Sequence, residues 1–141
     1  MESCKIKTKY PFFVYEFEKE ELPLEVKLQA YTPFIPLDSQ NSGMPVAQMK
    51  YSVTNRSDQT VNVSVCGTMY NFTGFTSYDG YDRLYQDGIP VNSFIENDGL
   101  SGLYFESSEI DKKSVNYGNL ALFSSNENIT VKPYWQDGGW W

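Results

Sequence analysis

Acidic side chains are the residues of this sequence that could most directly do chemistry. Paired carboxyl groups can supply a general acid and a nucleophile or base, as in the hydrolysis of glycosidic bonds. Three of them, Glu16, Glu18 and Glu20, alternate along an expected strand and its end, so they project together and favour solvent. We interpret them as a solvated edge that discourages pairing between sheets rather than as catalytic groups. The remaining candidates are Glu21, Glu25, Asp79, Asp82 and Asp87.

Other reactive residue types lack the partners that their chemistry needs. The chain contains no histidine, which excludes a Ser-His-Asp triad. Cys4, in an expected frayed terminus, and Cys66 form no CxxC pair, so we interpret them as reduced thiols of a cytoplasmic protein. The aspartates of YDGYDRLYQDG (78–88) depart from the spacing of a calcium loop. The sequence therefore predicts no catalytic triad, no metal and no cofactor.

Two groups of aromatic residues are candidate contact sites. Tyr78, Tyr81 and Tyr85 lie beside Asp79, Asp82 and Arg83, a mixture suited to glycan recognition, to packing on a neighbouring domain or to a self-packed loop. Trp135, Trp140 and Trp141 fall within the last seven residues. An exposed tryptophan pair at a chain end would form an interface patch, and the alternative is that the pair covers its own domain.

Length and charge restrict the class of protein. The 141 residues predict a single domain, 1–141, large enough to fold without a disulfide or metal. The formal net charge is −7, so we expect neither nucleic-acid nor anionic-membrane binding. The first residues have no apolar core of signal-peptide length, and no run is long enough to span a membrane. We therefore interpret the sequons at Asn55, Asn62, Asn71 and Asn128 as turns and strand edges.

The pattern of apolar residues predicts strands throughout the chain. A period of two predicts seven to nine strands and an antiparallel β-sandwich, with 46–54 and 60–67 as the clearest hairpin. Residues 74–102 are rich in glycine and aspartate and read as a long excursion with one short strand, PVNSFI. The other expected strands are 10–17, 24–31, 102–107, 119–125 and 129–135, and 38–43 is an expected loop.

The segment LPLEVKLQAYTPFIPL (22–37) combines a strand with a proline-pinned corner. Its alternating first half predicts one buried face, whereas Pro33 and Pro36 bracket Phe34 and Ile35 in a stretch that cannot donate fully to a sheet. We expect this apolar corner to pack against the body of the sandwich or against a neighbouring domain.

These residues, followed by MPVAQMKYSVTNRSDQTVNVSV, resemble the N-terminal domain of glycoside hydrolase family 116, the bile-acid β-glucosidase and non-lysosomal glucosylceramidase group. The resemblance extends to YPFFVYEF, and more loosely to YGNLALFSSN and YWQDGGWW. It implies that the catalytic carboxyls lie in a separate C-terminal (α/α)₆ barrel of the same polypeptide, and that this chain is a non-catalytic fragment of a longer N-terminal domain. The alternatives are a stand-alone carbohydrate-binding module and an adhesion-type sandwich, and the lack of a visible signal peptide argues against the latter.

Overall fold

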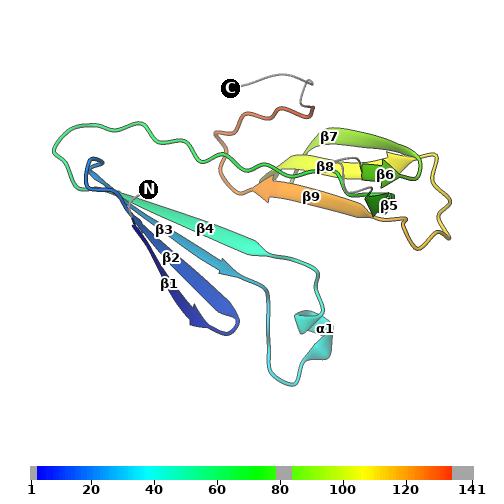
Figure 1. Cartoon of the computed structure of the whole chain (residues 1–141), viewed down its shortest axis with the longest axis horizontal. Helices are drawn as coiled ribbons and strands as arrows, with labels where there is room; N and C mark the ends of the chain where they lie inside the picture. Colours follow the sequence, from blue (N-terminus) through cyan, green and yellow to red (C-terminus); the bar gives the residue numbers. More distant parts are fainter. Residues whose placement is uncertain (1–2, 79–83, 135–141) are drawn as a thin grey trace. The chain divides into compact units, whose positions relative to one another are not determined.

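The computed structural model describes residues 3–78 and 84–134, and strands dominate both ranges (Figure 1). The chain divides into two compact units, Met1–Ser64 and Val65–Trp141. Whether the two units form a single domain stays a prediction. None of the helices in the described residues is long and apolar enough to cross a membrane.

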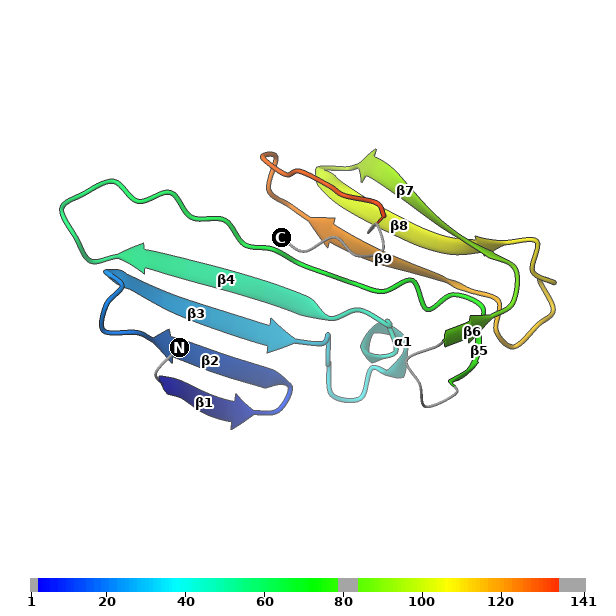
Figure 2. The same ribbon diagram turned by 45° about the horizontal axis from the view of Figure 1, so that its top comes forward.

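The first unit holds one antiparallel sheet of four consecutive strands. These are β1 (Ser3–Lys9), β2 (Phe12–Glu18), β3 (Leu24–Tyr31) and β4 (Gln48–Asn55), in the order β1-β2-β3-β4. The strands lie side by side in this order in both ribbon views (Figures 1 and 2). A four-residue helix, α1 (Ser39–Ser42), lies between β3 and β4.

The two faces of this sheet differ in charge, because side chains alternate along each strand and the register aligns them. One face, here called the uncharged face, carries no ionisable carboxylate, ammonium or guanidinium group. Its residues are Cys4, Ile6, Thr8, Phe13, Tyr15, Phe17, Leu24, Val26, Leu28, Ala30, Met49, Tyr51, Val53 and Asn55. Ile6 and Met49 are each more than half exposed, and such an apolar face is what a layer of a sandwich buries.

The opposite face, here called the charged face, carries all the charged residues of the four strands. These are Lys5, Lys7, Lys9, Glu16, Glu18, Glu25, Lys27 and Lys50. The alternation of charged and uncharged residues explains why the four segments form strands whose uncharged side chains share one face of the sheet.

The second unit contains a hairpin and a three-stranded antiparallel sheet. The hairpin joins β5 (Phe75–Tyr78) to β6 (Leu84–Gln86), and the sheet has the order β7-β8-β9. Its strands are β7 (Ile89–Asn97), β8 (Leu100–Ser108) and β9 (Asn119–Ser124). Asp98 and Gly99, both with positive φ, form the two-residue turn between β7 and β8. Phe105 of the central strand is 1% exposed and forms the core.

The antiparallel all-β class is confirmed, and several element predictions are wrong. Residues 60–67 form no strand, and β4 pairs with β3, so the expected hairpin of 46–54 with 60–67 does not exist. The expected excursion 74–102 contains β5, β6, β7 and the start of β8, so it holds more strands than expected, and its one expected strand, PVNSFI, is confirmed within β7. Residues 129–134 form no strand, and the expected loop 38–43 contains α1.

The N-terminal residues also differ from expectation. Cys4 lies in β1, which pairs with β2 along its whole length, and not in a frayed terminus. Because β1 covers one side of β2 and β3 covers the other, Glu16 and Glu18 do not lie on an edge strand. Glu16 pairs with Lys7 of β1 and Lys27 of β3, and Glu18 pairs with Lys5 of β1. Their expected position on an edge is therefore wrong, whereas Glu18 is exposed to solvent as expected.

Candidate functional site

The predicted aromatic contact sites fall largely outside the described residues. Tyr81, Trp135, Trp140 and Trp141 all lie there, so the predictions for them stay predictions. The backbone of Tyr78 ends β5, and Tyr85 is the middle residue of β6, paired with Ser77. The Tyr85 side chain is 49% exposed, so its ring is accessible in this unit.

The proline corner, by contrast, is fully described. It follows β3 and consists of Pro33, Phe34, Ile35, Pro36 and Leu37. The phenyl ring of Phe34 packs edge-on against the ring of Tyr10, with ring centroids 5.0 Å apart. Three apolar side chains nevertheless remain accessible: Phe34 is 43% exposed, Ile35 51%, and Leu37 fully. Within the first unit, the corner therefore projects apolar groups into solvent.

Hydrogen bonds within the loop hold this corner in place. The Ser42 hydroxyl accepts from the Ile35 amide at 2.9 Å and donates to the Ile35 carbonyl at 3.0 Å. The Asp38 amide also donates to the Ile35 carbonyl, at 3.1 Å. Asp38 caps α1 by accepting from the amide of Asn41 at 2.9 Å, and the bonds from Asn41 lower the pKa of the Asp38 carboxyl. The exposed apolar groups thus stand on an ordered frame.

A shallow hollow of about 250 Å³ lies beside the corner. Its lining residues are Phe34, Ile35, Leu37, Asp38, Ser39 and Ser42. The Asp38 carboxylate, which is already engaged by Asn41, is the charged group of this lining. The hollow is therefore suited to apolar contact rather than to bond-breaking chemistry.

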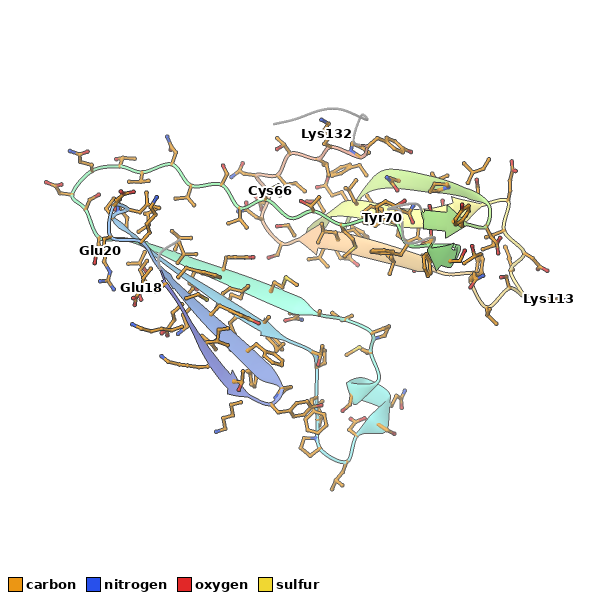
Figure 3. The ribbon with its side chains drawn as sticks, in the orientation of Figure 1. Glu18, Glu20, Cys66, Tyr70, Lys113 and Lys132 are labelled. Carbon is orange, nitrogen blue, oxygen red and sulfur yellow. The ribbon has the colours of Figure 1, made fainter. Side chains whose placement is uncertain are left out.

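The candidate carboxylates of the charged face are arranged as ion pairs. Lys7 donates to both carboxylate oxygens of Glu16, at 2.9 and 3.0 Å, and this contact lowers the pKa of Glu16. Lys5 donates to Glu18 at 2.8 Å and lowers its pKa in the same way (Figure 3 labels Glu18). A glycosidase acid needs a raised pKa, so both shifts run opposite to that requirement. Arg56 engages Glu25 in a further pair.

A buried polar cluster around Asn71 was not predicted from the sequence. Asn71 is 8% exposed, and its amide nitrogen donates to the side chain of Asn92 at 2.9 Å and to the carbonyls of Glu106 and Val91 at 3.1 and 3.3 Å. Its side-chain oxygen accepts from the amide and hydroxyl of Thr73. The amide nitrogen that a glycan would need is therefore fully engaged inside the second unit.

The sequence contained a signal for the charged face and for the Asn71 cluster. Lys5, Lys7 and Lys9 alternate with Cys4, Ile6 and Thr8, the period of a strand with one charged face. For Asn71 the available signal was the N-x-T pattern, which also describes an asparagine side chain that accepts from the backbone two residues later, as Asn71 does from Thr73. Nothing comparable in the sequence indicated that Leu37 is exposed.

The comparisons with known proteins agree with the motif analysis. The model of a family described as "beta-glucosidase 2, glycosyl-hydrolase family 116 N-term" matches residues 1–139. This match confirms the resemblance that starts from the strand and corner at 22–37. Among curated proteins the comparison finds no match. Since the matched residues make up nearly the whole chain, the protein belongs to the N-terminal domain family of the family-116 glycosyl hydrolases.

Proposed function

We propose that this chain is a non-catalytic β domain of a β-glucosidase or glucosylceramidase-type hydrolase, which packs against a separate (α/α)₆ catalytic domain of the same polypeptide. The observation that carries the proposal is the proline corner, where Phe34, Ile35 and Leu37 are exposed on a hydrogen-bonded frame. An ordered apolar projection of this kind is typical of a docking contact. By docking there, the domain would shape the approach to the substrate pocket.

The electrostatics of the carboxylates support a non-catalytic role. Glu16 and Glu18, the best-defined carboxylate neighbours, have lowered pKa values because lysines donate to them. They remain ionised at neutral pH and cannot act as a general acid there. In the proposal, the acid and the nucleophile come from the catalytic domain.

We place the protein in the cytoplasm. Cys4 and Cys66 are both exposed free thiols, which suits a reducing compartment. The burial of the Asn71 amide argues against glycosylation at that sequon, since a glycan must reach solvent.

A second candidate function is carbohydrate binding by the chain itself. Its supporting observation is the exposed ring of Tyr85, which could stack on a sugar face. This alternative would extend to Tyr78 and Tyr81 and to the terminal tryptophans at 135, 140 and 141.

Two measurements on the purified chain separate these functions. Incubation with an aryl β-glucoside should give no turnover, because the catalytic carboxyls lie elsewhere. Titration with glucose and cellobiose should leave the tryptophan fluorescence without a saturable change. Hydrolysis that is lost on substituting one acidic residue would overturn the non-catalytic role. Saturable sugar binding that weakens in Tyr85→Ala, but not in the matched exposed variant Tyr117→Ala, would favour the binding module instead.

A further inference from the structure

The segment between β4 and β5 has the pattern of a strand but no strand partner. Val61, Val63 and Val65 alternate with Asn62 and Ser64, yet residues 60–72 form no strand. Within the described part of the chain, residues 60–70 also take part in no backbone–backbone hydrogen bond. The three valines are 37%, 46% and 56% exposed. Figure 3 labels Cys66 on this connection.

The same segment lies in the longest uncharged stretch of the protein. No charged residue occurs from Gln59 to Tyr78, between Asp58 and Asp79. Exposed strand edges are normally protected by charged side chains or proline, and neither occurs in 60–66. An uncharged segment of high β propensity with free backbone groups is a template for pairing with another strand.

We propose that residues 60–66 pair, antiparallel and about a two-fold axis at Val63, with the same residues of a second copy of this chain. The register would oppose Val61 to Val65 and Asn62 to Ser64, with Val63 opposite its counterpart and Thr60 opposite Cys66. The segment TVNVSVC is self-complementary in this register, because apolar residues meet apolar residues and polar residues meet polar ones. This interaction goes beyond the docking role proposed for the corner at 33–37.

Charge permits a second copy to approach at this segment. Each copy carries a formal charge of −7, so two copies repel one another unless they meet where charge is absent. The stretch from Gln59 to Tyr78 meets that condition, because it contains no charged residue that could oppose a charged residue of the second copy's stretch. A single strand pair buries less than a standard interface, so we expect a concentration-dependent equilibrium rather than a permanent dimer.

Sedimentation velocity over a range of chain concentrations tests the association. The natural sequence should shift from monomer toward dimer as concentration rises. Val63→Lys places two like charges opposite each other at the two-fold axis and should raise the dissociation constant by at least roughly tenfold. Val63→Thr, which keeps a β-branched and uncharged residue, is the matched control and should retain most of the association. A chain that stays monomeric at every concentration would overturn the proposal.

Cross-linking tests the register independently. In a Cys4→Ser background, Thr60→Cys places a new thiol opposite the natural Cys66 of the second copy, within disulfide range of a directly opposed pair. Mild oxidation should then give a disulfide-linked dimer on a non-reducing gel. The control Ser64→Cys in the same background places its thiol opposite Asn62 and should cross-link far less. Equal cross-linking of both variants, or a dimer that survives Val63→Lys, would assign the contact to another surface and contradict the proposal.

Discussion

At the scale of single residues, Asn71 connects several strands of the second unit through its hydrogen bonds. Its side chain joins β7, through Val91 and Asn92, to β8, through Glu106. The Gln86 side chain of β6 donates to the Asn71 carbonyl at 2.6 Å, which adds the hairpin to the same cluster. Both side-chain polar atoms of Asn71 and its backbone carbonyl thus have partners, and a buried polar group stabilises a fold when it is paired in this way.

Removing this side chain should destabilise the chain strongly. Asn71→Ala leaves the Thr73 amide and the Glu106 carbonyl without their partner, so we expect the free energy of unfolding to fall by about 2–3 kcal/mol. Urea unfolding followed by circular dichroism measures the change. Asn62→Ala, at an exposed asparagine in a similar sequon, should alter stability by less than about 0.5 kcal/mol. Equal effects of the two substitutions would show that the cluster contributes little.

At the scale of elements, the alternation of charged and uncharged residues predicted which side chains share a face of a sheet better than it predicted which strands pair. β2, β3 and β4 were expected within two residues of their ends, because each carries one wholly uncharged side. Residues 60–67 alternate equally well and form no strand, since a period of two says nothing about which neighbour supplies the hydrogen bonds. The expected strand PVNSFI lies within β7 and is confirmed, whereas β5 and β6 were missed because they are short and their stretch is rich in glycine and aspartate.

The candidate site was also predicted only in part, because residue types do not fix the backbone geometry. Proline spacing located the corner at 33–36, but the exposure of Leu37 follows from a left-handed backbone, φ 68°, that no residue type there signals. The aromatic sites at 78–85 and 135–141 were chosen by residue type, and the structure describes few of their side chains. Residue type therefore indicated where contacts could form, and backbone geometry decided which apolar groups reach solvent.

The backbone of Leu37 leads to a prediction about the corner. The left-handed conformation costs a non-glycine residue about 1–2 kcal/mol, while glycine loses more backbone entropy on folding. Leu37→Gly should therefore raise the free energy of unfolding by about 0.5–1 kcal/mol, even though it removes an apolar side chain. Leu37→Ala keeps the strain and should leave stability nearly unchanged, because the side chain is fully exposed. Thermal and urea unfolding measure both, and a destabilised Leu37→Gly variant would mean that the leucine packs within the chain.

At the scale of the whole molecule, charge is unevenly distributed along the chain. Residues 1–64 carry seven basic and eight acidic groups, a net charge of −1, and residues 65–141 carry four basic and ten acidic groups, a net charge of −6. Most basic groups of the first unit lie on the charged face, where lysines pair with Glu16 and Glu18, and Arg56, just after β4, pairs with Glu25. The excess of acidic groups therefore falls on the second unit, while the first unit is stabilised by paired charges.

The ion pairs of Glu16 and Glu18 make the stability of the folded chain depend on pH. The pKa of Glu16 and of Glu18 is lowered in the folded chain, so folding releases protons from these groups, and their contribution is complete above the ordinary glutamate pKa. This contribution to stability is lost as the pH falls from the ordinary glutamate pKa through the lower pKa of the folded chain. Since the sequence pI is about 4.5, protein concentration must be low in this range to avoid association.

The variant Lys7→Gln tests the contribution of one ion pair, Lys7 with Glu16. Because the bond from Lys7 is the main cause of the lowered Glu16 pKa, removing it should return that pKa toward its usual value. Urea midpoints at about pH 7 and about pH 3 should then differ less than in the natural chain, with the loss concentrated at neutral pH. Lys50→Gln, which removes a lysine from the same face but not from Glu16, should keep the natural pH dependence. If both variants respond to acid alike, net charge rather than the Lys7–Glu16 pair governs the acid stability of the sheet.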